Sequence, residues 1–127
     1  MAIFIALLLL SYLIGSVSGS LLLGRLRGID IRTQGSGNAG GTNAFRTQGV
    51  KFALGVVLID IGKGVLAVWL VQRFVSQPEW AGWAALLAAA AGHVWPIFHG
   101  FRGGKGAATL VGGLVIAWPW TLVPLLA

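Results

Sequence analysis

Cysteine is absent from the 127 residues, and acidic residues number only three. The lack of cysteine excludes disulfides, thiolate nucleophiles and cysteine-based metal sites. Charged residues make up 9% of the chain, whereas an average soluble domain has about 25%. Hydrophobic residues make up 57% of it, and the mean hydropathy is +0.87. A chain so poor in charge cannot cover its own surface with polar groups, so the composition predicts lipid surroundings.

Nine Lys and Arg residues outnumber the three acidic residues and give the chain a net charge of +6. A basic protein can bind nucleic acid when its charges gather on one polar domain. In this chain the basic residues flank apolar runs, as they do in loops beside membrane spans. We therefore expect lipid as a partner and no nucleic acid.

Four apolar segments have nearly the length that crosses a bilayer, which is roughly 20 residues. They predict an all-α, polytopic membrane helix bundle that forms a single domain over residues 1–127, because helices satisfy their own backbone groups in lipid. The first segment carries no charge and has no basic region before it, so we expect a retained span and not a signal peptide. The expected spans are residues 1–24, 52–72, 80–98 and 107–127.

The connections between these segments differ in charge. Residues 25–51 and 99–106 together hold seven Lys or Arg, and residues 73–79 hold one. Two spans separate the first and third connections, so both lie on one side of the membrane. Because basic loops stay inside, the asymmetry predicts that both loops are cytoplasmic and that the N-terminus is outside.

Both basic connections are rich in glycine. Gly35–Arg46 reads GSGNAGGTNAFR, and Gly100–Gly106 reads GFRGGKG. Flexible backbone amides beside a fixed positive charge form anion sites. In the first loop, Thr42 or Asn43 could cap a helix whose positive end faces the anion, with Arg46 one turn further on. In the second, Lys105 is either an interfacial lysine that sets topology or a phosphate ligand, and its glycine neighbours favour the ligand.

Other motifs are excluded by their context. Gly35, Gly37 and Gly40 have the spacing of a dinucleotide fingerprint, which requires a preceding strand and a βαβ unit, whereas a membrane span precedes this loop. The second loop lacks the Ser or Thr that follows the lysine of a nucleotide-binding P-loop. The sequence contains no His-x-x-x-x-Asp dyad and no metal-binding cluster.

The second apolar segment contains two charged residues, Asp60 and Lys63. They are one helical turn apart and share a face. A pair that faces the bundle interior is the usual arrangement for charges at this depth. The pair is either a structural ion pair or a means of orienting a loop residue. His93 has a similar ambiguity, because it is either a hydrogen-bonded packing residue or a general base. Pro119 predicts a kink or the end of regular helix in the last segment.

The two motifs together resemble a known family. Gly35–Arg46 and Gly92–Thr109 are similar to the first two signature motifs of the bacterial acyl-phosphate:glycerol-3-phosphate acyltransferases, the PlsY-type family. Residues 15–16, 30–32 and 60–63 are similar to other parts of it, so the resemblance covers nearly the whole chain. It implies a multi-pass enzyme of the bacterial inner membrane with about seven spanning helices.

The resemblance also implies the reaction. A fatty acyl group passes from acyl phosphate to the 1-hydroxyl of glycerol 3-phosphate, which yields lysophosphatidic acid and phosphate in phospholipid biosynthesis. Arg46 and Lys105 would hold the two phosphate-bearing substrates and stabilise charge on the acyl carbonyl. A substrate phosphate would accept the proton, with His93 as the rival base, and no metal or other cofactor is expected. The expected catalytic residues are Ser36, Arg46, His93 and Lys105; the expected binding residues are Gly35, Gly37, Asn38, Gly40, Thr42, Asn43, Gly103, Gly104, Gly106 and Thr109; the expected supporting residues are Ser16, Arg32, Asp60 and Lys63.

The chain departs from the family pattern near its end. The third family motif, which contains His, Asn and Glu, has no counterpart before Ala127, and the chain stops within apolar sequence. We therefore expect this chain to be an N-terminal part of the enzyme that is inactive alone. Two other functions are compatible with basic loops between spans, an anion or phosphate carrier and a non-catalytic scaffold. A carrier needs similar chemistry on both faces, and here the loops share one face.

Overall fold

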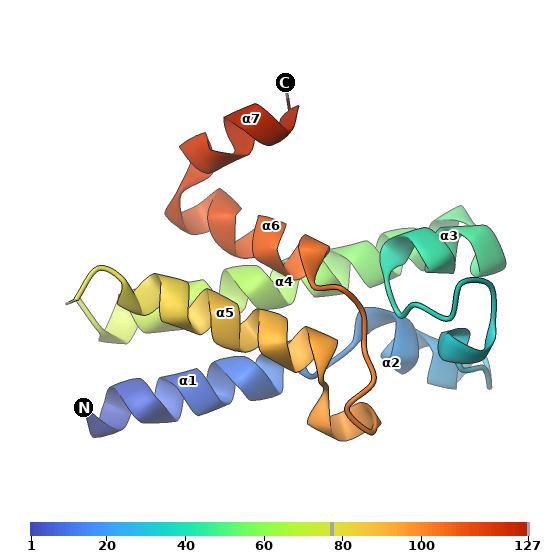
Figure 1. The fold of residues 1–127 in the computed structure, drawn as a ribbon, viewed down its shortest axis with the longest axis horizontal. Coiled ribbons are helices and arrows are strands. Elements are labelled where there is room, and N and C mark those ends of the chain that lie inside the picture. The colour runs from blue at the N-terminus through green and yellow to red at the C-terminus, as the bar shows by residue number, and fades with distance from the viewer. Residues whose placement is uncertain (77, 127) are drawn as a thin grey trace.

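The computed structural model describes residues 1–76 and 78–126, and within these residues all regular structure is helical (Figure 1). This agrees with the all-α class predicted from the apolar segments. The helices, in chain order, are α1 (Ala2–Gly15), α2 (Gly19–Leu26), η1 (Ile31–Thr33), α3 (Gly41–Gln48), α4 (Val50–Phe74), α5 (Ala81–Val94), η2 (Ile97–His99), α6 (Ala107–Ala117), η3 (Pro119–Leu122) and α7 (Val123–Leu126), where η marks a 3₁₀ helix.

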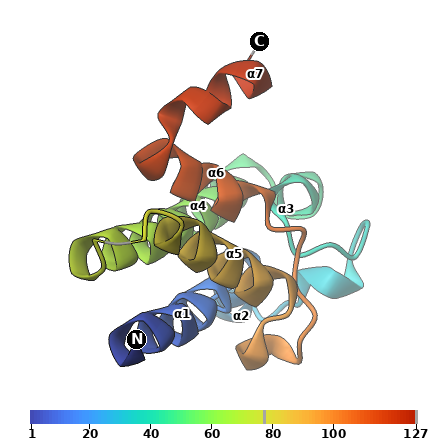
Figure 2. The same ribbon diagram turned by 60° about the vertical axis from the view of Figure 1, so that its left-hand side comes forward.

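Three helices, α1, α4 and α5, run side by side along the long axis of the molecule, and α6 packs against α4 (Figures 1 and 2). The N-terminus lies at one end of this axis. The short elements α2, η1 and α3 lie at the other end, together with η2 and the connection to α6 (Figure 1). Both glycine-rich connections therefore lie at the same end of the bundle, as their shared charge predicted.

Two helices are long and apolar enough to cross a membrane, namely α4 with 25 residues and the segment Ala81–His99 with 19. The pair α1 and α2 counts as a third span if its bend of 47° is allowed. The expected single helix over residues 1–24 is therefore a broken one. The number of spans, expected to be four, is two or three by length and composition among the described residues.

Hydrogen bonds explain the break between α1 and α2. Ser16 Oγ donates back to the Tyr12 carbonyl at 2.9 Å, and Ser18 Oγ accepts from the Leu21 amide at 3.4 Å, as the N-cap of α2. The carbonyls of Gly15 and Val17 are left without helical partners at this break. Lys63 of α4 donates to both of them, so the break is stabilised from the neighbouring helix.

The last apolar segment is also interrupted. Helix α6 spans 11 residues and ends at Ala117, and Pro119 begins the 3₁₀ turn that follows. Proline lacks an N–H and its ring obstructs the preceding turn, so the helix stops where the sequence predicted. The expected span over residues 107–127 is thus not one continuous helix, and its last residue, Ala127, lies outside the described residues.

Small residues allow the long helices to approach closely. A Cβ atom at Gly64 would lie 2.0 Å from the Thr109 carbonyl oxygen, at the contact of α4 with α6. A Cβ at Gly92 of α5 would lie 2.1 Å from the Tyr12 carbonyl oxygen of α1. Backbones that meet at this distance exclude any larger residue. Such packing is typical of helices associating in membranes, where burial of apolar surface contributes little.

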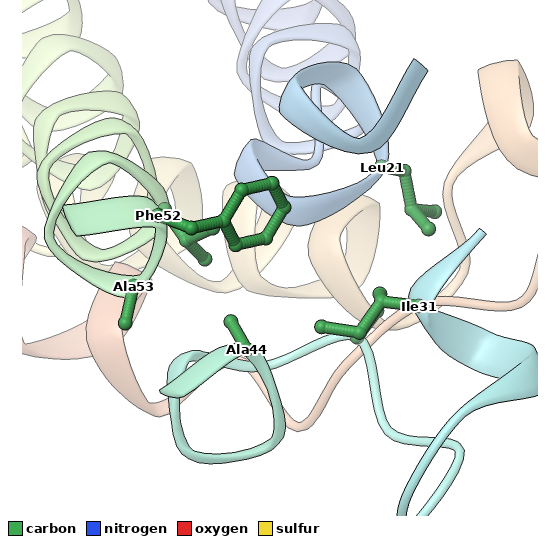
Figure 3. Close-up of a cluster of buried hydrophobic side chains, with 7 residues drawn as sticks. Leu21, Ile31, Ala44, Phe52 and Ala53 are labelled. Atoms are coloured by element: carbon green, nitrogen blue, oxygen red, sulfur yellow. The ribbon is translucent and has the colours of Figure 1, made fainter. Parts of the chain in front are cut away.

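A separate apolar core lies at the end of the molecule that carries the loops. Its labelled members in Figure 3 point toward one another from α2, η1, α3 and α4. They are Leu21, Ile31, Ala44, Phe52 and Ala53. This core attaches the first glycine-rich loop to the long helices, so the loop is held at both of its ends.

The close approach of α4 to α6 is testable. Gly64→Ala should lower the melting temperature of the detergent-solubilised protein, because the new methyl group forces the two helices apart, and overpacking of this kind costs about 1–3 kcal/mol. Gly62→Ala is a matched control on the same helix, since nothing beyond its chain neighbours and the backbone of its own helix lies within 4 Å of its Cβ position. Circular dichroism melts of the two variants would contradict this packing if both melted at the wild-type temperature.

Candidate functional site

Arg32 joins the two glycine-rich connections. Its Nη1 donates to the carbonyls of His99 and Arg102, the latter at 2.9 Å. Its Nε and Nη2 bind the Asp30 carboxylate, with Nη2 2.7 Å from Oδ2. These bonds hold the pKa of the Asp30 carboxyl below its usual value, chiefly through the Arg32 side-chain hydrogen bonds. Arg32, expected to be a supporting residue, thus holds the two loops together from a half-buried position.

The first loop is organised around the buried amide of Asn43. Its Nδ2 donates to the carbonyls of Ile31, Gln34 and Asn38 at 3.2, 3.0 and 2.9 Å. Its Oδ1 accepts from the Ser36 amide at 3.1 Å. Four bonds to loop backbone occupy this side chain, which was expected to position substrate or to cap a helix. In this structure it determines the shape of the loop.

Helix α3 begins at a different residue from the one expected. Its N-cap is Gly40, and no side chain caps it. Thr42 and Asn43 both lie inside the helix, so the proposed capping role for them is wrong. Arg46 lies in the last turn and its side chain is exposed. The first-turn amides of α3 are consequently free of side-chain caps, and a helix start in this condition attracts anions.

The second loop uses its glycines for packing. The Gly103 amide donates to the Val94 carbonyl at 3.0 Å, and the Gly104 amide donates to the His93 carbonyl at 3.2 Å. A Cβ at Gly103 would overlap the His93 carbonyl oxygen. These two amides, expected to bind phosphate, are therefore used to complete the end of α5. Gly106, with φ of 85°, turns the chain into α6.

A cavity of about 900 Å³ lies between the two loops, and Arg46 and Lys105 both line it. The start of α3, at Gly40 and Gly41, and the start of α6, at Gly106, line it too. Two positive helix ends and two flexible cations thus surround one volume. This arrangement can bind anions with phosphate chemistry.

The cavity separates the expected site residues into two groups. All four expected catalytic residues line it: Ser36, Arg46, His93 and Lys105. Five of the expected binding residues also line it: Asn38, Gly40, Thr42, Asn43 and Gly106. The other five lie outside its lining: Gly35, Gly37, Gly103, Gly104 and Thr109.

Three of the residues outside the lining have structural roles. Gly35 and Gly37 adopt φ of 53° and 78°, a region that residues with a side chain rarely enter, and so they shape the first loop. Thr109 is fully buried and its Oγ1 donates to the Asp60 carbonyl at 3.0 Å, so it joins α6 to α4. Its expected role in substrate binding has no support in this position. Ser16, an expected supporting residue, accepts a bond from the Ile97 amide at 3.4 Å.

A buried polar cluster forms the floor of the cavity. Asp60 Oδ1 lies 3.2 Å from Lys63 Nζ, and Lys63 Nζ lies 2.7 Å from His93 Nδ1. Asp60 Oδ1 also accepts from the Gly19 amide at 3.1 Å, at the start of α2. The Asp60–Lys63 ion pair predicted from the sequence is present. It orients the α1–α2 break, which is a segment that the sequence analysis did not connect with the pair.

The apolar side of the cavity was missed by the sequence analysis. Phe45 of α3 and Val50, Leu54 and Val57 of α4 line it. The three α4 residues recur at i, i+4 and i+7, which places them on one face of the helix. That periodicity was readable in the sequence, but in a helix apolar on nearly every side it does not distinguish a cavity from lipid contact.

The comparisons with known proteins agree with the resemblance. The profile of the Glycerol-3-phosphate acyltransferase family matches residues 5–127. The chain belongs to this family. A glycerol-3-phosphate acyltransferase of Symbiobacterium thermophilum is 47% identical over 119 residues, which cover 94% of this chain and 59% of the relative. One of Escherichia fergusonii is 47% identical over 117 residues, which cover 91% of this chain and 57% of the relative.

Solved structures agree as well. The glycerol 3-phosphate form of PlsY (YgiH), an integral membrane glycerol 3-phosphate acyltransferase, superposes with a TM-score of 0.84 at 36% identity. Its lysophosphatidic acid form gives 0.81 at 35% identity. Each comparison covers 92% of this chain and 58% of the solved chain. The chain is thus a helical membrane protein of this fold, and it spans somewhat more than half the length of the relatives it matches.

Within residues 1–76 and 78–126, no group of three or more His, Asp or Glu side chains is arranged to hold a metal ion. Asp60 and His93 are close to each other, but Lys63 lies between them and occupies the position that a cation would need.

Arg32 can be tested as the connection between the loops. Arg32→Ala should speed hydrogen–deuterium exchange in residues 99–104, because the carbonyls of His99 and Arg102 lose their partner. Arg25→Ala, at an exposed position in the last turn of α2, is the matched control and should leave this exchange unchanged. Equal exchange in wild type and Arg32→Ala would show that the loops are held together by other contacts.

Asp30 makes the same connection sensitive to acid. Its pKa is lowered in the folded protein, so its contribution to stability is complete above the unfolded pKa of about 3.9 and is lost as the pH falls through the folded value. The melting temperature of Asp30→Asn should therefore lie below that of wild type by a constant amount from about pH 7 to pH 5. The difference should shrink as the pH falls below about 4 and through the lowered pKa of the folded protein. A difference that closed on raising the pH would contradict this sign.

Proposed function

We propose that the protein containing this chain transfers a fatty acyl group from acyl phosphate to the 1-hydroxyl of glycerol 3-phosphate. Family membership supports this proposal. The two solved relatives support it as well, because they are described as the glycerol 3-phosphate form and the lysophosphatidic acid form of the enzyme. The observation that carries it is the cavity where Arg46 and Lys105 meet the starts of α3 and α6. Both substrates bear phosphate, and the departing group is phosphate as well.

The two sides of the cavity suit the two parts of acyl phosphate. The phosphate would lie among the cations and helix starts, and its tail would lie along Phe45, Val50 and Leu54, all of them exposed apolar side chains. A guanidinium can hold phosphate with two parallel hydrogen bonds, while the ammonium of Lys105 acts as a point charge. The carbonyl carbon would then be held near the positive helix ends, where developing negative charge is stabilised.

The reaction needs no strong base. The glycerol 3-phosphate hydroxyl oxygen attacks the acyl carbon, and the bond from that carbon to the phosphate oxygen breaks. The hydroxyl proton passes to the departing phosphate, so that lysophosphatidic acid and inorganic phosphate leave. Acyl phosphate is a mixed anhydride and is already activated, so holding the reactants together contributes most of the rate. Ser36, exposed at the cavity, would orient a phosphate oxygen.

We also propose that the two loops face the cytoplasm of a bacterial cell, at its inner membrane. Seven of the nine basic residues lie in the loop segments 25–51 and 99–106. Basic loops beside spans remain on the cytoplasmic side, where soluble glycerol 3-phosphate would reach the cavity. The acyl tail would enter from the lipid on the apolar side.

The catalytic contribution of Arg46 and Lys105 can be measured on the protein that contains this chain. Arg46→Ala and Lys105→Ala should each lower kcat/KM for acyl phosphate by about 10²–10³-fold, which is typical of losing one group that stabilises transition-state charge. Lys51→Ala is the matched control, because this exposed lysine lies outside the cavity. The assay is phosphate release that depends on both substrates.

Two outcomes would contradict this assignment. Wild-type protein that released no phosphate in the presence of both substrates would exclude the proposed reaction. Full activity in Arg46→Ala and Lys105→Ala, together with loss of activity in His93→Ala, would exclude the electrostatic mechanism and favour a histidine base.

A further inference from the structure

The His93 side chain lies at the floor of the cavity, and its two ring nitrogens have different surroundings. The side chain is 3% exposed, close to the C-terminal end of α5. Nδ1 faces Lys63 Nζ at 2.7 Å, and Asp60 Oδ1 lies 3.7 Å from the same nitrogen. Nε2 lies on the opposite edge of the ring, beside Gly104. The chemistry of the ring therefore depends on which nitrogen carries a proton.

The surroundings of Nδ1 determine which of the two ring nitrogens carries the proton. Lys63 donates to the carbonyls of Gly15 and Val17 at 2.8 and 3.0 Å, and an ammonium has three donors and no acceptor. Near the third donor lie Asp60 Oδ1 at 3.2 Å and His93 Nδ1 at 2.7 Å, and because an ammonium cannot accept, Nδ1 can face it at this distance only as an acceptor. Asp60 and Lys63 together are neutral, so a neutral imidazole completes an uncharged buried cluster, whereas an imidazolium beside Lys63 would bury an uncompensated charge. The proton of the ring consequently lies on Nε2.

The surroundings of Nε2 leave that proton available. A Cβ atom at residue 104 would overlap Nε2, so only glycine leaves this edge of the ring uncovered. No described residue forms a hydrogen bond with Nε2, yet the described residues contain no buried side-chain nitrogen or oxygen without a partner. Nε2 is therefore reached from open space, and His93 lines the cavity. Lys105 and the start of α6 line the same cavity.

We propose that Lys63 holds the His93 imidazole with its proton on Nε2, and that this N–H donates a hydrogen bond to a phosphate oxygen bound in the cavity. The proposal rests on the proposed function for the nature of the ligand. His93 is in this view a catalytic residue that acts as a donor, and Lys63 is a positioning residue that acts through it. A base role for His93 is excluded by the same geometry, because Nδ1 already accepts from Lys63 and Nε2 already carries its proton.

Nitrogen NMR can test the tautomer without turnover. Residues 1–127 contain two histidines, His93 and His99, and the ring resonances of His93 are identified as those that disappear from the ¹⁵N-histidine spectrum in His93→Gln protein. We expect the spectrum of the neutral Nε2–H tautomer in the absence of ligand. Saturating glycerol 3-phosphate is then added to one sample and a non-transferable acyl phosphonate to another. The compound that shifts the Nε2 resonance is the one whose phosphate or phosphonate group His93 contacts.

The spectra can overturn the proposal in two ways. A proton on Nδ1, or an imidazolium at neutral pH, would contradict the claim that Lys63 holds the ring with its proton on Nε2. An Nε2 resonance that moved with neither phosphate compound would remove the contact with ligand. Both results are obtained on resting protein, so they are distinguishable from a failure of acyl transfer, which would appear as wild-type protein that does not release phosphate.

Kinetics of two amide variants provide an independent test. The Gln side-chain nitrogen in His93→Gln can reach the position of Nε2, whereas the shorter Asn in His93→Asn cannot. We expect kcat/KM to stay within about tenfold of wild type for Gln and to fall about 10²-fold for Asn, the usual effect of removing one donor. Equal losses in two variants with equal melting temperatures would contradict the donor role. Lys63 is left unchanged, because it also holds the α1–α2 break.

Discussion

The buried contact between Asp60, Lys63 and His93 is the interaction on which the rest of the site depends. Charges in the interior of a membrane protein are tolerated only when they are paired, and this cluster is complete and neutral. It joins four helices: its side chains come from α4 and α5, and Lys63 and Asp60 bind the backbone at Gly15 and Gly19, where α1 and α2 separate. At this point the chain bends by 47° from α1 into α2.

The same cluster reaches the second loop through His93. The ring leaves room only for glycine at residue 104, and the His93 carbonyl accepts from that glycine's amide. Lys105 follows directly, so its position at the cavity is set from the interior. Arg32 connects this loop to the first one from outside, through the carbonyls of His99 and Arg102. The two cations at the cavity are thus placed by one buried contact and one surface contact.

Much of this arrangement could be predicted from the sequence, for identifiable reasons. The helical class followed from apolar length, the common end of the loops from their charge, and the ion pair from its i, i+3 spacing. The break at Gly15–Gly19 could not be predicted, because the lysine that satisfies its carbonyls lies 48 residues away from Gly15. The sequence indicated that both loops are rich in glycine, but it did not show what each glycine contacts. Gly103 and Gly104 serve backbone packing against α5, and only tertiary structure distinguishes such packing from phosphate binding.

A double-mutant cycle on Arg46 and Lys105 tests the central claim, that both cations act on one bound phosphate. The quantity to measure is kcat/KM for acyl phosphate in wild type, Arg46→Ala, Lys105→Ala and the double variant. Groups that share one partner are coupled, so the loss in the double variant should differ from the product of the single losses by a coupling energy above about 1 kcal/mol. Single losses that simply multiply would mean that the two cations act at separate sites, and would contradict this account.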